Sequence, residues 1–327
     1  MFGARETLEL TDLHGKVAIV TGGNSGIGYA TIQFLTEQGA KVYMGSRNEE
    51  KALTAIEQLQ ENLRQKNKTG GSVHWLRLDL LDPRLAERAA EEIIRKEKRL
   101  DILINNAAGG TPNSMTKDGL LEMMVVNYIS HFVLTETLLP LLKSTAAEKD
   151  SDVRIINLTS AYHAKVKVDS FVGKETLNKQ YGDTMKGHLY GVTKLANILH
   201  TKHLQSRLNS EGARITCITL HPGVVATPGV YQLFSSSGLL QKLLAKTIIP
   251  LFFQEPRQGA MNSAFAAASK QVAAARESTD EAEKKMYEGV YLMPIGKITE
   301  PSKYAKDERL QNELYETTRE ILDEMGL

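Results

Sequence analysis

The chain has 327 residues, a net charge of +1, 42% hydrophobic residues and a single cysteine. This length and apolar content suffice for one large α/β domain or two small ones. The balanced charge argues against a nucleic-acid partner, and one cysteine excludes an intrachain disulfide and any cysteine-cluster metal site.

The first residues, 1–13, are mixed acidic and polar and lack the apolar core of a secretory signal. No uninterrupted apolar run approaches the ~20 residues of a membrane span. No repeat, low-complexity tract or linker divides the chain. We therefore expect a cytoplasmic protein with a single domain over residues 1–327.

A glycine-rich turn follows the first predicted strand. Lys16–Thr21 is a short β-branched run typical of a buried parallel strand, and helical spacing begins at Tyr29–Gln38. Glycines between a strand and a helix let main-chain N–H groups approach a pyrophosphate. The alternative is a tight turn that is merely glycine-rich. The dinucleotide site predicted here comprises Gly22, Asn24, Ser25, Gly26, Ile27 and Gly28.

The spacing of these glycines, Gly-x-x-x-Gly-x-Gly after Thr21, resembles the nucleotide loop of the short-chain dehydrogenase/reductase family. The resemblance covers roughly Leu13 to Thr227. It implies a Rossmann-type, doubly wound α/β fold, with a parallel sheet of about seven strands and helices on both faces. It also implies hydride transfer between a nicotinamide cofactor and a carbonyl or alcohol carbon.

The end of the second predicted strand, Lys41–Gly45, bears on the cofactor. An NAD-type site has Asp or Glu there, whereas this chain has Ser46-Arg47, and its first acids, Glu49 and Glu50, follow in a helix. A hydroxyl and a guanidinium suit a 2′-phosphate, which a carboxylate would repel. The sequence thus predicts NADP(H). The alternative is that Arg47 is a solvated residue at the start of a helix.

Asp79-Leu80 follows the predicted strand Val73–Leu78. In the resembled family, an Asp at this position holds the adenine amino group. The alternative is that Asp79 caps the helix that begins near Pro83, and both roles can coexist.

Two consecutive asparagines, Asn105 and Asn106, follow the predicted strand Leu100–Ile104. Their amides are costly in a core unless they are hydrogen-bonded. The family has Asn-Asn-Ala-Gly here, which implies that Asn106 and Ala107 support the sheet and the cofactor. Ala108 departs mildly from that pattern.

A long amphipathic helix is predicted over Leu120–Lys143, and it carries Asn127 among apolar neighbours. A lone Asn in such a helix is usually a satisfied interior polar group. The family has its catalytic Asn here, holding a water that relays protons to a lysine, and we favour this interpretation.

Tyr190 and Lys194 stand four residues apart, so they share one face of a helix. A phenol loses its proton near pH ~10, and a neighbouring cation lowers that pKa. The family implies that Tyr190 is the acid/base and that Lys194 lowers its pKa and holds the nicotinamide ribose. It also implies that Ser160, after the predicted strand Val153–Leu158, donates to the substrate oxygen, with Thr159 as the fallback.

The predicted sixth strand, Arg214–Leu220, contains Cys217, which we expect to be buried. The residues after it fit the family's Pro-Gly-x-Val-x-Thr, which grips the nicotinamide; a simple Pro-Gly turn is the alternative. The matching positions are Pro222, Gly223, Val225 and Thr227. His200 and His203 are spaced three apart but lack a third ligand, so we predict no metal site.

The substrate-binding region is expected mainly from residues 161–189 and 228–260. The insert 162–188 is polar with scattered aromatics and is expected to shape the mouth of the cleft. Residues 238–253 are apolar with lysines and are broken by Pro250, so they suit either a lid over an apolar substrate or a peripheral membrane contact. A helix over Glu255–Ala275, a strand over Gly289–Met293 and a closing helix over Tyr304–Met325 complete the prediction.

Within the family, the resemblance narrows to the branch of retinol dehydrogenases and WW-domain oxidoreductases, although no WW domain is present. It rests on Lys117-Asp-Gly, Asn127-Tyr-Ile-Ser-His-Phe, the insert and Lys194-Leu-Ala-Asn. The branch implies an NADP(H)-dependent oxidoreductase that interconverts an apolar carbonyl and an alcohol. Two alternatives are a non-catalytic NADP-sensing or scaffolding protein and a membrane-peripheral dehydrogenase of lipid-like alcohols. Family members often pair through the helix that bears Tyr190, so a homodimer is a further expectation.

Overall fold

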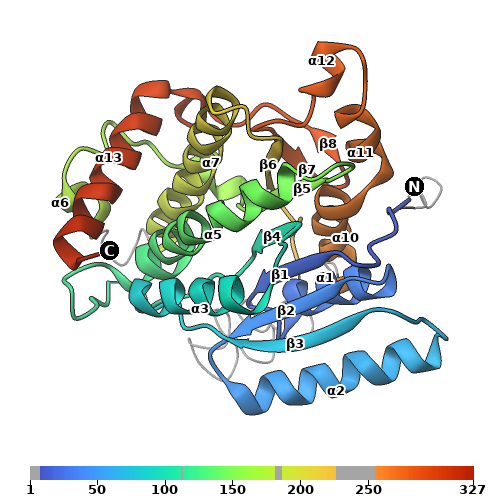
Figure 1. The fold of residues 1–327 in the computed structure, drawn as a ribbon. Coiled ribbons are helices and arrows are strands. Elements are labelled where there is room, and N and C mark those ends of the chain that lie inside the picture. Colours follow the sequence, from blue (N-terminus) through green and yellow to red (C-terminus); the bar gives the residue numbers. More distant parts are fainter. Residues whose placement is uncertain (1–7, 112, 181–185, 226–254) are drawn as a thin grey trace.

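The computed structural model describes residues 8–111, 113–180, 186–225 and 255–327 (Figure 1). The described strands form one sheet of eight in the order β3-β2-β1-β4-β5-β6-β7-β8. Neighbours pair in parallel from β3 to β7, and β8 pairs antiparallel with β7. The strands are β1 (Val17–Thr21), β2 (Lys41–Ser46), β3 (Ser72–Arg77), β4 (Ile102–Asn105), β5 (Val153–Leu158), β6 (Ile215–Leu220), β7 (Tyr291–Met293) and β8 (Lys297–Ile298).

Helices cover both faces of this sheet, as predicted (Figure 1). One face packs on α1 (Gly26–Glu37), α2 (Glu49–Gln65), α10 (Pro256–Ala268) and α11 (Lys270–Arg276). The other packs on α3 (Pro83–Lys96), α5 (Ser130–Ala146) and α7 (Lys186–Ser210). The remaining elements are α4 (Glu122–Met124), the π-helical turn η1 (Val125–Ile129), the 3₁₀ turns η2 (Ala161–Lys165) and η4 (Lys303–Lys306), α6 (Lys174–Leu177), α12 (Glu281–Lys284) and α13 (Glu308–Met325).

The central strands are buried along their whole length because helices cover both sides of them. Every residue of β1, β4, β5 and β6 is buried, which explains their near-continuous apolar sequences. Cys217 lies fully buried in β6, as predicted. The predicted count of about seven strands corresponds to the parallel ones. The two-residue β8 is exposed and has no apolar pattern to reveal it.

Several predicted element ends are corrected by local contacts. The predicted helix 255–275 is two helices, because the Ser269 side chain accepts a hydrogen bond from Val272 N–H and starts α11 afresh. The closing helix begins at Glu308 rather than Tyr304, after the N-cap Asp307. The helix predicted to end at Lys143 continues to Ala146 in α5.

The insert before α7 is not merely polar surface. Val166, Val168, Phe171 and Leu177 are buried in the same cluster as α7 and α13, and Phe171 is the most enclosed of them. Glu313 of α13 accepts hydrogen bonds from the Ser170 hydroxyl at 2.8 Å and from Phe171 N–H at 2.9 Å. The insert therefore anchors the C-terminal helix to the core.

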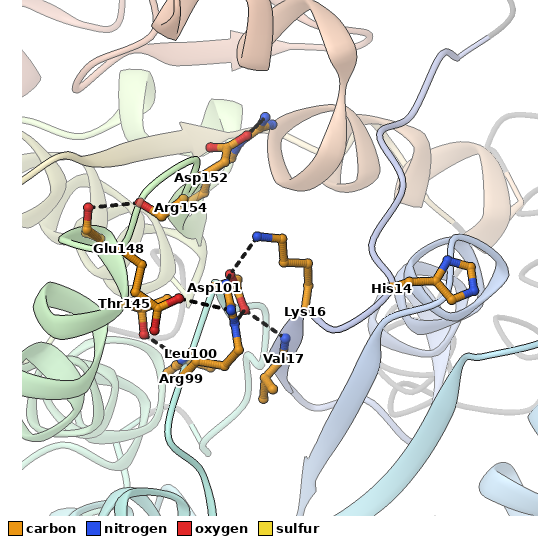
Figure 2. Close-up of polar contacts among 12 residues, drawn as sticks. His14, Lys16, Val17, Arg99, Leu100, Asp101, Thr145, Glu148, Asp152 and Arg154 are labelled. Atoms are coloured by element: carbon orange, nitrogen blue, oxygen red, sulfur yellow. Dashed lines mark hydrogen bonds and ion pairs between the residues drawn. The ribbon is translucent and has the colours of Figure 1, made fainter.

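Asp101 organises the amino edge of the sheet, where the parallel strands begin (Figure 2). Its buried carboxylate accepts a hydrogen bond from Val17 N–H at 2.9 Å and two from the Arg99 guanidinium at 2.7 and 2.9 Å. Lys16 Nζ lies 3.5 Å from it. The adjacent Leu100 N–H donates to the Thr145 hydroxyl at 2.9 Å and so ties β4 to α5.

Arg154 crosses the same edge toward α10. Although only 1% exposed, it pairs with Asp152 and donates to the carbonyls of Ala266 at 3.0 Å and Ser269 at 3.2 Å. A buried guanidinium is tolerated only with such full pairing. The amino edge is therefore structural, which leaves the carboxyl edge for ligands.

One helical stretch of the described chain, Glu122–Ala146, is long and apolar enough to cross a membrane. Of its most apolar window, 78% is buried inside the protein. This burial is typical of a core helix.

Candidate active site

The predicted site residues gather at the carboxyl edge of the sheet. Parallel strands β1, β2, β4, β5 and β6 all end there, at Thr21, Ser46, Asn105, Leu158 and Leu220. Open α/β sheets bind their ligands outside this edge.

The turn between β1 and α1 has the shape of a phosphate cradle. Gly22 has φ +65°, and a Cβ on Gly28 would lie 2.4 Å from the Gly22 carbonyl oxygen, so a side chain fits at neither position. α1 starts within the glycine turn, earlier than predicted, and its N-cap Ser25 makes no side-chain capping hydrogen bond. The Ser25 side chain therefore does not cap the first N–H groups of α1, and these groups suit a pyrophosphate.

Thr21 binds this turn to the loop after β4. Its hydroxyl accepts hydrogen bonds from Asn106 N–H at 3.0 Å and Ala107 N–H at 2.9 Å. The Asn106 amide donates to the Thr21 carbonyl at 2.7 Å. Both residues thus support the cradle. Asn105 supports the sheet, because its amide donates to Asn157 of β5 at 2.8 Å.

Ser46 and Arg47 lie at the end of β2. The Ser46 hydroxyl is buried and has no hydrogen-bond partner within the described chain. Arg47 is exposed, precedes the N-cap Asn48 of α2, and forms no ion pair with any described residue. A buried orphan hydroxyl beside an unpaired guanidinium fits a phosphate group.

Asp79 does not cap the next helix. The N-cap of α3 is Asp82, whereas the Asp79 carboxylate accepts a hydrogen bond from Leu81 N–H at 3.0 Å. The capping alternative is therefore wrong. Leu80 is buried, and its carbonyl accepts the Ser130 hydroxyl at 2.8 Å.

Ser160, Tyr190 and Lys194 converge where β5 meets α7. The Tyr190 phenol lies near enough to the Ser160 side chain for Ser160 to influence its pKa, and Lys194 Nζ lies 5.5 Å from the centroid of the Tyr190 ring. Lys194 donates to the Leu158 carbonyl at 3.1 Å. The hydroxyl of Thr159, the fallback for Ser160, donates to the Lys194 carbonyl at 2.6 Å and is already engaged.

Burial dominates the electrostatics of this cluster. It raises the pKa of Tyr190 above its ordinary value, although the hydrogen bond with Ser160 lowers it in part. It lowers the pKa of Lys194 to about 8. The Lys194 ammonium donates to the Leu158 carbonyl, and its effect on the pKa of Tyr190 in the presence of the cofactor stays a prediction.

Asn127 lies in the π-helical turn η1 and is 1% exposed. Its side-chain oxygen accepts Gly109 N–H at 2.8 Å, and its amide donates to the Thr193 hydroxyl at 3.1 Å. The carboxamide therefore joins the β4 loop to α7 through one acceptor and one donor position. The main-chain carbonyl oxygen of Asn127 lies 3.3 Å from His131 Nδ1. Single π-helical turns within helices are frequent at functional sites.

Three residues of the site were not predicted. Tyr162 is 44% exposed, and its ring centroid lies 6.1 Å from that of Tyr190. His163 Nδ1 lies 2.7 Å from the Ser160 carbonyl, and its Nε2 accepts Ser302 N–H at 3.1 Å. His131 contacts both Thr21 and Asn127. Of these three, only His131 had a signal in the sequence, because it follows the predicted site residue Asn127 by one helical turn.

The Pro-Gly turn after β6 borders the same edge. Gly223 has φ +93°, and Val225 packs so closely on Gly259 that a Cβ there would lie 2.4 Å away. Thr227 and the segment 238–253 lie outside the described residues. The described chain holds no group of three His, Cys, Asp or Glu that could bind a metal.

His200 and His203 have packing roles. The His200 ring centroid lies 5.1 Å from that of Phe132, and the His203 ring stacks on Tyr315 of α13 at 4.2 Å.

Comparisons with known proteins agree with this geometry. Residues 16–172 match the family model of the short chain dehydrogenases. A short-chain dehydrogenase/reductase of Armillaria gallica is 42% identical, over 96% of this chain and 94% of its own. Retinol dehydrogenase 14 of Homo sapiens is 35% identical, over 80% of this chain and 75% of its own.

Solved structures share the fold. The Pseudomonas aeruginosa RhlG/NADP complex aligns with a TM-score of 0.62 at 24% identity, over 87% of this chain and 96% of its own. L-Sorbose reductase of Gluconobacter frateurii, complexed with NADPH and L-sorbose, aligns with a TM-score of 0.63 at 20% identity. The alignment covers 88% of this chain and 98% of the reductase.

Proposed function

This chain belongs to the short-chain dehydrogenase/reductase family, and we propose that it uses NADP(H) to interconvert an apolar aldehyde or ketone and its alcohol. The observation that carries the proposal is the position of Lys194 Nζ, 5.5 Å from the Tyr190 ring centroid, at the carboxyl edge where Ser160 follows β5. When bound, the nicotinamide supplies or accepts the hydride.

The residues of the cradle suit this cofactor. Uncapped N–H groups at the start of α1 would hold the pyrophosphate, and Thr21 and Asn106 keep that turn in place. The orphan Ser46 hydroxyl and the unpaired Arg47 guanidinium would bind a 2′-phosphate. The bound cofactors named for RhlG and L-sorbose reductase, NADP and NADPH, agree with this choice.

Ser160 and Tyr190 would hydrogen-bond the carbonyl oxygen of the substrate and polarise it. Since burial raises the pKa of Tyr190, this phenol keeps its proton at neutral pH and can donate it to the developing alkoxide. The reductive direction therefore needs no prior ionisation of Tyr190. Lys194 would hold the nicotinamide ribose, and Asn127 would supply its carbonyl to the proton relay.

Apolar surface beside this site supports an apolar substrate. The partly exposed ring of Tyr162 borders Tyr190, and Val224 on the Pro-Gly turn is 54% exposed. The relative named retinol dehydrogenase 14 agrees with this substrate class. Whether residues 238–253 form a lid or a membrane contact stays a prediction.

The test is NADPH oxidation against aldehydes and ketones graded from small and polar to long and apolar, with NADH in parallel. We expect turnover to rise with apolar length and to require NADPH. Tight NADPH binding without turnover of any carbonyl would instead support a sensor or scaffold. Flotation with liposomes, with and without residues 238–253, tests the membrane alternative.

A further inference from the structure

His131 connects the nucleotide-binding turn to Asn127. It lies in the first turn of α5, one turn after Asn127, and is 4% exposed. Its Nε2 lies 2.9 Å from the Thr21 hydroxyl, and its Nδ1 lies 3.3 Å from the main-chain carbonyl oxygen of Asn127.

The hydrogen bonds around Thr21 assign the tautomer of His131. The Thr21 hydroxyl already accepts two hydrogen bonds, from the N–H groups of Asn106 and Ala107. A hydroxyl has two acceptor positions and one proton, so the proton of Thr21 must go to His131 Nε2. His131 Nε2 is therefore the acceptor, and Nδ1 carries the proton that is donated to the Asn127 carbonyl.

The surroundings keep His131 neutral. The pKa of His131 is lowered to about 3, chiefly by burial, with the bond to Asn127 opposing this and the nearby Lys194 ammonium adding to it. A neutral imidazole with a fixed tautomer transmits a positional change from one side of the ring to the other without changing charge.

We propose that His131 is a positioning residue that couples the nucleotide-binding turn to the main-chain carbonyl of Asn127. The Asn127 carboxamide bridges Gly109 and Thr193, and we assign the proton relay to the main-chain carbonyl. By donating from Nδ1 to this carbonyl while Nε2 contacts Thr21, His131 fixes its direction relative to the nucleotide-binding turn. The relay part of this inference rests on the proposed function.

Two substitutions of His131 test its two hydrogen bonds one at a time. His131→Asn keeps a donor near the position of Nδ1 but cannot reach Thr21. His131→Gln keeps an acceptor near the position of Nε2 but loses the donor to Asn127. Because one hydrogen bond contributes about 1 kcal/mol, each loss is worth roughly fivefold.

The H131N enzyme should bind NADPH about fivefold more weakly and keep kcat within about twofold. The H131Q enzyme should bind NADPH within about twofold of wild type, lose about fivefold or more in kcat, and show a shifted pH–rate profile. His200→Phe is the matched control, because His200 is also buried on a core helix but its ring packs on Tyr128 and Phe132 rather than on Thr21 or Asn127. It should leave the NADPH Kd, kcat and pH profile unchanged.

A readout independent of activity is the ¹⁵N NMR signature of the imidazole in the full-length protein. We expect an Nδ1–H tautomer that stays neutral down to pH 5. An Nε2–H tautomer would overturn the inference. So would H131N and H131Q enzymes that, like H200F, differ from wild type in stability alone. If wild-type enzyme turns over no carbonyl, the proposed function fails, whereas the tautomer and the NADPH Kd still decide the coupling.

Discussion

Lys194 Nζ lies 5.5 Å from the ring centroid of Tyr190, yet it donates its hydrogen bond to the carbonyl of Leu158. Asn197 donates to the same carbonyl at 3.1 Å. The lysine is thus held beside the tyrosine by the end of β5. Burial raises the pKa of Tyr190, so the phenol keeps its proton at neutral pH, and burial lowers the pKa of Lys194 to about 8.

Replacing Tyr190 with Phe should abolish turnover and spare cofactor binding. The change removes one hydroxyl that donates a proton, and general acid catalysis contributes about 10²–10⁴-fold. We expect kcat to fall by about 10³-fold, with an NADPH Kd within about twofold of wild type. Single-turnover kinetics and fluorescence titration measure the two quantities. Retained turnover would remove Tyr190 from its role.

The rate of carbonyl reduction should fall as the pH rises through about 8, because Lys194 then loses its proton and its charge. Below that pH the ammonium is present, so the rate should be flat on the acid side near neutrality. The profile of kcat/KM against pH measures this. Lys194→Met should leave a low residual rate that no longer falls as the pH rises through about 8. If the rate of this variant still falls there, another group is responsible for the pH dependence.

Arg47→Asp should discriminate between the two nicotinamide cofactors. It replaces an exposed, unpaired guanidinium by a carboxylate that repels a 2′-phosphate. A charged hydrogen bond is worth about 1.5–3 kcal/mol, so NADPH should bind roughly 10–100-fold more weakly. The Kd of NADH should change by less than about threefold. Equal losses for both cofactors would contradict the NADP(H) assignment.

Asp101→Asn should destabilise the protein without changing its kinetics. The substitution leaves the Arg99 guanidinium with its pairing weakened at the amino edge, opposite the active site. Breaking such a buried pair costs about 2–4 kcal/mol. Urea denaturation measures the loss. The control is Glu148→Gln, which removes the exposed partner of Arg99 and should cost less than about 1 kcal/mol.

The buried histidines should make the protein sensitive to acid. Burial lowers the pKa of His131 and His200 to about 3, whereas an unfolded chain protonates histidine near pH ~6.5. Their contribution to stability is therefore present above pH ~6.5 and is lost as the pH falls toward 3. Each histidine adds about 1.4 kcal/mol per pH unit to this slope.

His200→Phe isolates one of these contributions, because phenylalanine fills the same aromatic pocket beside Tyr128 and Phe132. The free energy of unfolding of H200F should depend on pH less steeply between 6 and 4, by about 1.4 kcal/mol per unit. Parallel curves for the two proteins would mean that His200 is already charged in the fold.

The parts of the fold that the sequence predicts are those with local signals. The glycine turn, the β-branched strands and the spacing of Tyr190 and Lys194 are each written within a few residues. The helix break at Ser269 and the burial of Phe171 were missed, since they depend on capping and on contacts with α13 rather than on periodicity.

The same limit applies to the site. The positions of its residues at strand ends followed from the topology of a parallel sheet. The roles of Thr21 and His131 did not, because their partners lie 85 to 110 residues away in the chain. The burial that raises the pKa of Tyr190 was not foreseen either, since sequence spacing does not reveal how deeply a phenol is buried.

The C-terminal helix α13 covers α7 from within the same chain. Tyr315 stacks on His203 and accepts a hydrogen bond from Arg207, and Thr318 is hydrogen-bonded to the Tyr128 hydroxyl. As a result, Gly191–His200 is buried throughout in a single protomer. In this chain, α13 packs on α7, the helix that bears Tyr190 and through which we expected a homodimer. Removal of α13 would therefore expose apolar side chains of α7, such as Leu195 and Leu199, that this shared cluster now buries.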